Sequence, residues 1–352
     1  MNRFDYICPG SVAEAVSAAA EPGSAYLAAG TNLLDLMKIG VSRPIRLIDI
    51  TRLPGLDTIE WQADGGVRIG AMVRNSDLAY DPQFATAFPA VAEALLSGAS
   101  AQLRNAATVG GNLMQRTRCA YFQDTASRCN RREPGSGCDA LEGENRLHAV
   151  VGWSDRCIAT HPSDFCVPLV ALDAVVEVEG PDGQRKVPLE SFHRLPGETP
   201  EKETVLAPGE LITAVHLPAE AARFKANARY LKLRERTSYA FAVVSAAAAL
   251  DIEDGLIRQA RLALGAVAAR PWRVREAEDA LVGSAPGTAA FARAAEIALE
   301  GARSSGDNAF KIELAHRIAV RALSLAAEGT PQVMPALPAS PFSTIPGVNH
   351  VA

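Results

Sequence analysis

The chain has 352 residues, of which 48% are hydrophobic and 21% charged, as in a globular protein with room for two or three domains. Its net charge of −5 gives no global reason to expect nucleic acid or an anionic membrane as a partner. No apolar run reaches the roughly 18 residues of a membrane span, so none is expected.

Residues 1–57 are predicted to form a small α/β unit. Ser11 and Glu14 make a capping-box pattern at the start of a helix over 11–20. Short strands are expected at 26–29 and 45–50, with a helix over 33–39 between them. This alternation of strands and helices predicts a compact first subdomain.

Residues 58–220 are predicted to form a second subdomain of strands and helices. We expect strands at 67–72, 174–179 and 211–217, helices from 75, over 89–96 and over 163–172, and a hairpin turn at 181–183. A cysteine-bearing segment, residues 114–160, interrupts this subdomain.

Residues 223–330 are predicted to form a separate domain. Three strands are expected at 224–236, 241–252 and 256–268, followed by helices at 273–281, 288–300 and 311–327. The last helix carries apolar residues at a helical period, so the domain should be a three-stranded sheet backed by helices. Residues 331–352, rich in proline, are expected to be an extended tail, disordered or laid against a partner.

Two glycine-containing turns are candidates for an anion site. The run 29–32 follows a strand and opens a helix, where free backbone N–H groups could face a phosphate that small side chains let approach. The run 108–112 holds two consecutive glycines between short polar residues. Taken separately, the first could be an ordinary strand–helix turn and the second a hairpin turn.

Four of the six cysteines lie between residues 119 and 157, which favours metal or redox chemistry over a disulfide scaffold. Their long, irregular spacing lacks the close pair usual in zinc sites and suits a larger iron–sulfur cluster, whose charge the many arginines nearby could balance. Zinc and a structural or disulfide role remain alternatives. Cys8 and Cys166 fit neither spacing, and we expect Cys166 to be a buried core residue and His161 a packing residue.

Together, the two turns and the run 160–164 resemble the flavin-binding subunits of the xanthine dehydrogenase, or molybdenum hydroxylase, family. The family's Ala-Gly-Gly-Thr-Asp/Asn-Leu-Leu is matched by 28–34, with Ala29 in place of a glycine. Its Ala-Thr/Ser-Val/Ile-Gly-Gly-Asn-Ile/Leu is matched by 107–113, and its Ser-Asp pair by Ser163 and Asp164. The resemblance covers residues 1 to about 330. It implies an α+β fold with a two-part FAD-binding domain (PCMH or vanillyl-alcohol-oxidase type) and a C-terminal domain like that of the CO dehydrogenase flavoprotein.

The resemblance also implies the residues that bind FAD. Both turns would cradle the pyrophosphate, Asp164 would accept a hydrogen bond from the flavin side, and Lys232 would lie near the isoalloxazine ring. No catalytic residue is expected in this chain. The implied cofactor-binding set is Leu27, Ala28, Ala29, Gly30, Thr31, Asn32, Leu33, Leu34, Thr108, Val109, Gly110, Gly111, Asn112, Ser163, Asp164, Ile212 and Lys232.

The cysteine-bearing segment is similar to that of the middle subunit of bacterial molybdenum aldehyde oxidoreductases. This resemblance implies a [4Fe-4S] cluster on Cys119, Cys129, Cys138 and Cys157. It also implies a large partner with the molybdenum cofactor, a small partner with [2Fe-2S] clusters, and electron transfer through FAD to an external acceptor. Hydroxylation of an N-heterocycle, reduction of an aryl-CoA, or a zinc-stabilised binding module are the alternatives.

The expected location is the cytoplasm, because the first residues lack the apolar core of a secretory signal. A partner subunit that carries a signal could instead take the complex to the periplasm.

Overall fold

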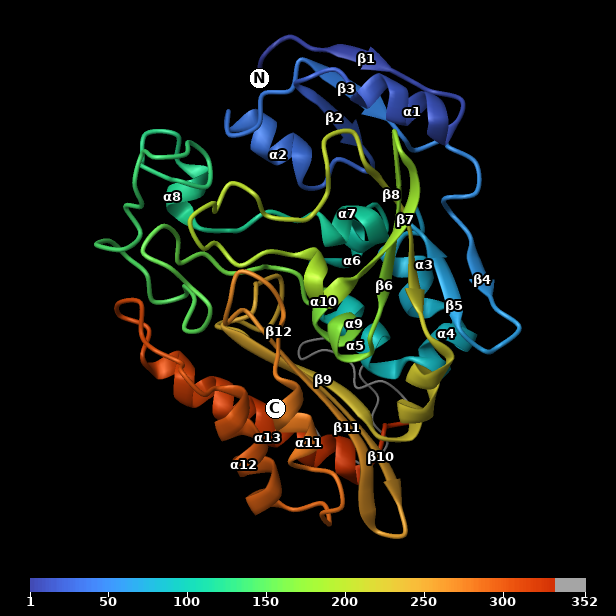
Figure 1. Ribbon diagram of the computed structural model, residues 1–352, viewed down its shortest axis with the longest axis vertical. Coiled ribbons are helices and arrows are strands. Elements are labelled where there is room, and N and C mark those ends of the chain that lie inside the picture. Colours follow the sequence, from blue (N-terminus) through green and yellow to red (C-terminus); the bar gives the residue numbers. More distant parts are fainter. Residues whose placement is uncertain (333–352) are drawn as a thin grey trace, which may run out of the picture.

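The computed structural model describes residues 1–332, so nearly all of the predicted tail at 331–352 lies outside the described residues. Figure 1 shows three sheet-containing parts stacked along the long axis, with the N-terminal unit at one end and the C-terminal helices at the other. No helix within residues 1–332 has the length and apolar character needed to cross a membrane.

The N-terminal unit is a three-stranded parallel sheet of order β1-β3-β2 with two helices. Ser11 caps α1 as predicted, since its side chain accepts a hydrogen bond from the Glu14 amide, while the Glu14 carboxylate accepts one from the Gly10 amide. The short strand β1 was not predicted. The elements are β1 (Asp5–Ile7), α1 (Val12–Ala19), β2 (Ser24–Leu27), α2 (Leu33–Lys38) and β3 (Arg46–Asp49).

The second unit is a five-stranded antiparallel sheet of order β4-β5-β8-β6-β7, packed against α3, α5 and α9. The predicted hairpin turn is present, because Gly180 and Gly183 pair where β6 turns into β7. The elements are β4 (Ile59–Trp61), β5 (Val67–Gly70), α3 (Asn75–Tyr80), α4 (Pro82–Ala87), α5 (Pro89–Ser97), α6 (Ala101–Arg104), α7 (Val109–Leu113), α8 (Ala120–Gln123), α9 (Cys166–Ala171), β6 (Val175–Gly180), β7 (Gly183–Pro188), α10 (Leu189–Phe192) and β8 (Leu211–Leu217).

The C-terminal domain has a four-stranded antiparallel sheet of order β12-β11-β10-β9, one strand more than predicted. The chain returns after β11 to pair Trp272 and Arg273 with that strand, where a helix was expected to begin. Residues 219–226 form a 3₁₀ helix, so β9 starts later than predicted. The elements are η1 (Ala219–Ala226), β9 (Ala228–Leu233), β10 (Val244–Glu253), β11 (Leu256–Gly265), β12 (Trp272–Arg273), α11 (Arg275–Asp279), α12 (Thr288–Ala298) and α13 (Phe310–Glu328).

The cysteine-bearing segment 114–160 lies at the side of the molecule and contacts both ends of it (Figure 1). Phe122 and Cys129 pack on Leu36 of α2. At the other end, the fully buried Lys311 of α13 donates hydrogen bonds to the carbonyl oxygens of Leu147 (2.9 Å) and His148 (2.8 Å). The segment is therefore fixed to the N-terminal unit and to the C-terminal domain.

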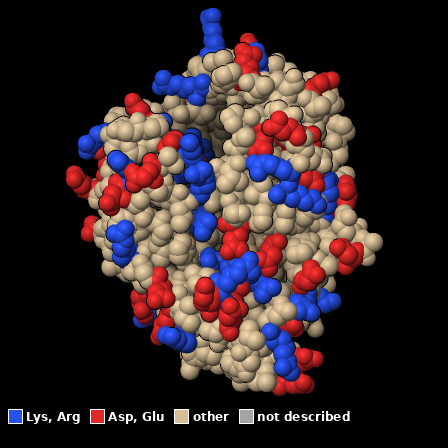
Figure 2. All heavy atoms as spheres, in the orientation of Figure 1, with Lys and Arg blue, Asp and Glu red and all other residues tan. Residues whose placement is uncertain are grey.

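The charged side chains on the face drawn in Figure 2 are mixed over most of the surface. Lys and Arg side chains gather along a hollow in the middle of this face, whereas acidic and basic groups alternate around it. Because a hollow with basic walls attracts anions, this feature is electrostatically distinct from the rest of the face.

Candidate functional site

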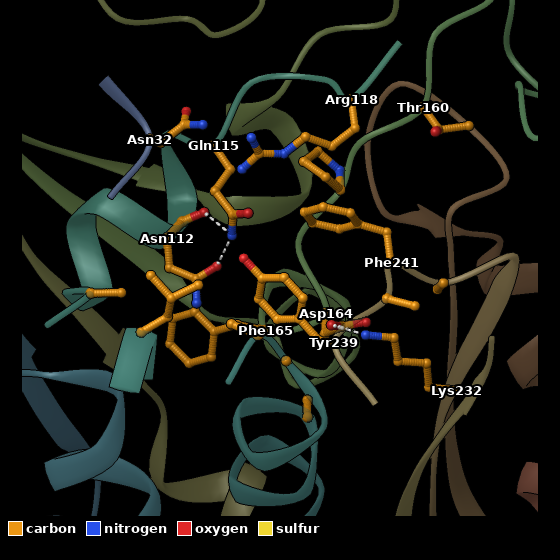
Figure 3. A pocket seen from close by; sticks show the side chains of 18 of the residues that line it. Asn32, Asn112, Gln115, Arg118, Thr160, Asp164, Phe165, Lys232, Tyr239 and Phe241 are labelled. Atoms are coloured by element: carbon orange, nitrogen blue, oxygen red, sulfur yellow. Dashed lines mark hydrogen bonds and ion pairs between the residues drawn. The ribbon is translucent and has the colours of Figure 1, made fainter. Parts of the chain in front are cut away.

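A cleft with a volume of ≈ 670 Å³ lies where the N-terminal unit, the second unit, the cysteine-bearing segment and the C-terminal domain meet. Figure 3 shows polar side chains from all four parts pointing toward it. Several of its buried polar atoms have no partner among residues 1–332, which is the signature of a site that takes a polar ligand. These atoms are Asn32 Nδ2, Asn75 Oδ1, Arg104 Nε and Arg118 Nε.

One wall of the cleft is a buried ion pair between Asp164 and Lys232. Lys232 Nζ lies 2.8 Å from Asp164 Oδ2 and donates a second hydrogen bond to the carbonyl oxygen of Ser97 at 3.1 Å. Tyr230 Oη donates to the other carboxylate oxygen of Asp164 at 2.6 Å. Burial, followed by the charge of Asp164, raises the pKa of Tyr230 well above its usual value, so its hydroxyl remains a donor.

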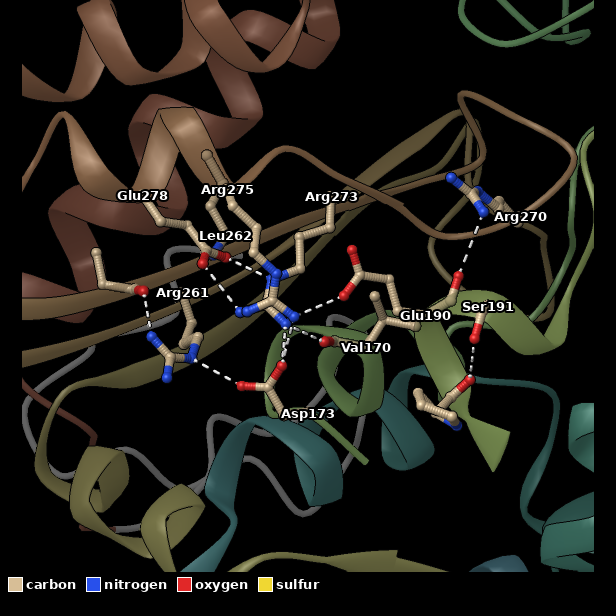
Figure 4. A network of polar contacts seen from close by, with 12 residues as sticks. Val170, Asp173, Glu190, Ser191, Arg261, Leu262, Arg270, Arg273, Arg275 and Glu278 are labelled. Atoms are coloured by element: carbon tan, nitrogen blue, oxygen red, sulfur yellow. Dashed lines mark hydrogen bonds and ion pairs between the residues drawn. The ribbon is translucent and has the colours of Figure 1, made fainter. Parts of the chain in front are cut away.

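A separate ion-pair cluster holds the C-terminal domain against α9 (Figure 4). The fully buried Arg273 side chain donates to Glu278 at 2.7 and 2.9 Å. It also donates to Asp173 at 2.7 Å and to the Val170 carbonyl oxygen at 2.7 Å. These contacts tie β12 and α11 to the end of α9, and so fix the sheet that carries Lys232.

The first glycine turn leaves donors free for a ligand. Gly30 has φ +75°, a conformation that a side chain disfavours, and an added Cβ would lie 2.7 Å from Leu34. Within residues 1–332, the amides of Gly30, Thr31 and Asn32 have no hydrogen-bond acceptor. Three adjacent unpaired N–H groups beside a cleft form the kind of cradle that binds an anion.

The second glycine turn begins helix α7, and its amides are already engaged. Thr108 is the N-cap and accepts from the Gly111 amide through its hydroxyl and from the Asn112 amide through its carbonyl oxygen. The Gly110 amide donates to Ala71 at 2.8 Å, and an added Cβ there would lie 2.9 Å from the Ala71 Cβ. Gly110 therefore packs against Ala71, whereas Gly111 lines the cleft, and an added Cβ there would lie 3.0 Å from the Thr108 hydroxyl oxygen.

A chain of hydrogen bonds joins the segments on either side of the insertion. Ser163 Oγ donates to Asn112 Oδ1 at 2.7 Å, and Gln115 Nε2 donates to the same oxygen at 2.5 Å. Asn32 Oδ1 accepts from the Arg116 amide at 3.2 Å, which links the first turn to the residues after the second. Turns that are far apart in the sequence thus form one site.

The predicted flavin-binding residues divide into those that line this cleft and those that support it. The lining residues are Thr31, Asn32, Gly111, Asn112, Asp164 and Lys232. Ile212 lies near the start of β8, where it pairs with Val178 in the core of the sheet, and does not line the cleft. The other predicted residues lie in the segments that carry the lining ones: Leu27, Ala28, Ala29, Gly30, Leu33, Leu34, Thr108, Val109, Gly110 and Ser163.

Part of the cleft wall was not predicted from the sequence. The guanidinium of Arg118 lies 4.9 Å from the ring centre of Phe241, and Tyr239 lies beside them (Figure 3). Tyr230 could have been found, because it precedes Lys232 by two residues and must share its face of a strand. Arg118 and Phe241 are 123 positions apart, and only the fold brings them together.

The four clustered cysteines are close together beside the cleft. Cys129 and Cys138 face each other across a β-bridge, and the Arg131 guanidinium lies 3.7 Å from Cys157 Sγ. Cys119 lines the cleft, and His148 Nε2 lies 3.2 Å from its sulfur. No three of the four sulfurs lie within 4.8 Å of one another. A tetrahedral zinc ion would hold them about 3.8 Å apart, so the arrangement is wider than a zinc site needs.

The surroundings of Cys119 and Cys138 disfavour free thiolates. Burial raises the pKa of the Cys119 thiol to about 12, partly opposed by the N–H groups of Phe122 and Tyr121. Burial also raises the pKa of Cys138, and the charges of Cys157 and Cys129 raise the pKa of both. A metal centre would compensate this repulsion and release the protons.

Comparison with known proteins identifies the family. Residues 2–220 match the FAD binding domain in molybdopterin dehydrogenase, and residues 229–326 match the CO dehydrogenase flavoprotein C-terminal domain. The aldehyde oxidoreductase FAD-binding subunit PaoB of Escherichia coli K12 is 50% identical over 319 residues, which are 90% of this chain and 96% of that protein. The chain is an FAD-binding subunit of the molybdenum hydroxylase family.

Solved structures agree with this assignment. One is the CO dehydrogenase of Hydrogenophaga pseudoflava, with a TM-score of 0.72 and 29% identity over 92% of this chain and 97% of that one. Another is the quinoline 2-oxidoreductase of Pseudomonas putida 86, with a TM-score of 0.71 and 27% identity over 93% and 98%. The α+β fold, the FAD cofactor and the role as an oxidoreductase subunit, all predicted from the sequence, are confirmed.

Proposed function

We propose that this FAD-binding subunit carries a [4Fe-4S] cluster and transfers electrons in a molybdenum-dependent oxidoreductase that converts an aldehyde to a carboxylic acid. The observation that carries the proposal is the position of the cysteine cluster, because Cys119 and its partner His148 form part of the cleft wall. A cluster on these cysteines would therefore lie beside the flavin. The name of the 50% identical relative, an aldehyde oxidoreductase subunit, supports the choice of substrate.

The residues of the cleft fit the chemistry of FAD. Bound FAD supplies the redox chemistry, and the protein supplies position and electrostatics. The free amides of Gly30, Thr31 and Asn32 suit the pyrophosphate, and the absent side chain of Gly111 lets it approach. Asp164, held by Lys232 and Tyr230, is left in a fixed orientation as an acceptor for the flavin.

The cysteine cluster fits an iron–sulfur centre better than a zinc ion. Its sulfurs are spread more widely than a single ion needs, and N–H groups and Arg131 face them. Hydrogen bonds and cations near the sulfurs stabilise a negatively charged cluster. We assign Cys119, Cys129, Cys138 and Cys157 as its ligands.

The proposal requires partner subunits. A large partner holds the molybdenum cofactor and oxidises the aldehyde with water, releasing two electrons and two protons per carboxylic acid formed. A small partner with [2Fe-2S] clusters passes the electrons to this chain, which delivers them to an external acceptor.

The test begins with the purified full-length chain. We expect flavin absorption bands over a broad iron–sulfur absorption, with four iron atoms per chain in the [4Fe-4S] assignment. Cys129→Ser should lower the iron content and leave FAD bound, and the exposed Cys8→Ser is the matched control. A colourless chain with stoichiometric zinc would refute the redox assignment in favour of a zinc-stabilised module.

The substrate is tested with the assembled complex. Anaerobic addition of an aromatic or aliphatic aldehyde should bleach the flavin bands of this subunit, whereas an N-heterocycle or an aryl-CoA should not. Bleaching by an N-heterocycle alone would favour a related hydroxylase. If the complex instead consumed an aryl-CoA in the presence of a reductant, the result would favour an aryl-CoA reductase.

A further inference from the structure

A second group of metal-ligating side chains lies behind the second glycine turn, apart from the four clustered cysteines. One ring nitrogen each of His161 and His193 and the sulfur of Cys166 lie within 4.8 Å of one another. All three residues are buried, with relative exposures of 8%, 4% and 0%. They come from three separate segments: the stretch before α9, the first turn of α9, and the residue after α10.

The two imidazoles have ring nitrogens that lack a partner. His161 Nε2 and His193 Nδ1 are buried and have no hydrogen-bond partner among residues 1–332. Leaving such an atom unsatisfied costs about 1–3 kcal/mol, so two of them in contact need a physical reason. A bound ion would accept the lone pair of His193 Nδ1 directly, and that of His161 Nε2 once the proton of that ring moves to Nδ1, which here accepts a hydrogen bond from the Ser163 amide at 3.4 Å.

The orientation of His193 matches that of a metal ligand. Its Nε2 lies 2.9 Å from the Leu113 carbonyl oxygen, which fixes the proton on that nitrogen and leaves a lone pair on Nδ1. The ring packs edge-on against Phe192 at 4.9 Å, and its centre lies 4.3 Å from that of His161. Two contacts therefore hold the ring in place, and its unprotonated Nδ1 has no hydrogen-bond partner among residues 1–332.

The geometry points to a zinc site: we propose that His161, Cys166 and His193 bind one Zn²⁺, with a fourth position open to solvent. Two imidazole nitrogens and one thiolate form a borderline-soft donor set that suits zinc and excludes the hard cations Mg²⁺ and Ca²⁺. Ligand atoms in a tetrahedral zinc site lie about 3.3–3.8 Å apart. The two ring nitrogens and the sulfur, which lie within 4.8 Å of one another, would therefore have to move about 1 Å closer together when zinc binds.

The protonation states agree with this assignment. Burial lowers the pKa of His161 well below its usual value and that of His193 to about 4, so both rings are neutral at pH 7. Burial raises the pKa of the Cys166 thiol to about 12, and ion binding would displace its proton. Zinc binding at this site should therefore release one proton.

A route to the open position is present. Both imidazoles line a second cavity of ≈ 690 Å³, which adjoins the flavin cleft at Gln115, Thr117, Thr160 and Pro162, whereas the fully buried Cys166 does not line it. Arg131, the cation that faces His161, forms an ion pair with Glu203 at 2.9 Å. This pairing reduces the repulsion that an entering dication would meet.

The test uses the full chain with FAD and iron loaded. After equilibration with Zn²⁺ and removal of loosely bound ions, elemental analysis should find one zinc per chain. X-ray absorption at the zinc edge should show mixed nitrogen and sulfur ligands. His193→Gln and Cys166→Ser should each weaken zinc binding at least tenfold and leave iron and FAD in place.

Two controls separate this site from the cysteine cluster. Cys8→Ser, at an exposed position, and Cys129→Ser, in the cluster, should both retain the zinc. The proposal is overturned if the unaltered protein takes up no stoichiometric zinc, a result that does not depend on how any variant folds. It is also overturned if zinc is lost in Cys129→Ser or kept in both His193→Gln and Cys166→Ser.

Discussion

The ion pair of Asp164 and Lys232 gives the sharpest prediction about the flavin cleft. In Lys232→Met the carboxylate of Asp164, which is 9% exposed, keeps only the hydrogen bond from Tyr230. Breaking a buried pair in this way costs about 3–5 kcal/mol, because a buried charge is left uncompensated. At roughly 2–4 °C per kcal/mol, the apoprotein should melt on the order of 10 °C lower.

The double variant separates charge from packing. In Asp164→Asn with Lys232→Met no buried charge remains, and the amide oxygen can still accept from Tyr230. We therefore expect it to recover most of the lost stability, with a coupling energy of about 2–3 kcal/mol in the double-mutant cycle. Its FAD affinity should nevertheless fall, because the charged acceptor and the ammonium group are both gone.

The measurements are urea unfolding of the apoproteins and fluorescence titration with FAD. Additive stability effects in the cycle would show that the two side chains do not interact as described. Unchanged FAD affinity in the double variant would show that Asp164 and Lys232 do not contribute to FAD binding.

Three further predictions concern other parts of the molecule. Gly110→Val should lower the unfolding free energy by about 1–3 kcal/mol through overpacking against Ala71. Gly111→Ala places a Cβ 3.0 Å from the Thr108 hydroxyl that caps α7, so it should lower the unfolding free energy by about 1 kcal/mol and weaken FAD binding at least tenfold, as urea unfolding and FAD titration of both variants would show. Arg273→Leu should cost about 3–5 kcal/mol in urea unfolding because Glu278 stays buried, and an equally stable variant would contradict the ion-pair cluster. Burial lowers the pKa of His193 to about 4, so the unfolded chain binds more protons below pH 6.5. The metal-free protein should therefore lose about 2 kcal/mol from this group between pH 7.5 and 5, and His193→Gln should flatten that dependence.

Local sequence patterns determined much of the secondary structure of this protein. The cap at Ser11, the hairpin at 181–183 and the bounds of β8 follow from turn chemistry and periodicity within a few residues. The resemblance carried by the two turns identified the family and its cofactor. Short-range features of this kind are readable because their physical causes, backbone conformation and side-chain spacing, act between near neighbours.

Only the tertiary structure decided which residues of those motifs face the cleft. Two adjacent glycines look equivalent in sequence, but Gly110 packs on Ala71 while Gly111 borders the cleft. The amides of the first turn are free, whereas in the second turn the amides of Val109 and Gly110 donate to residues about 40 positions earlier. His161 and His193 likewise became a group only through the packing of α9 and α10. Such assignments depend on distances between remote segments, which the whole fold sets and no local pattern encodes.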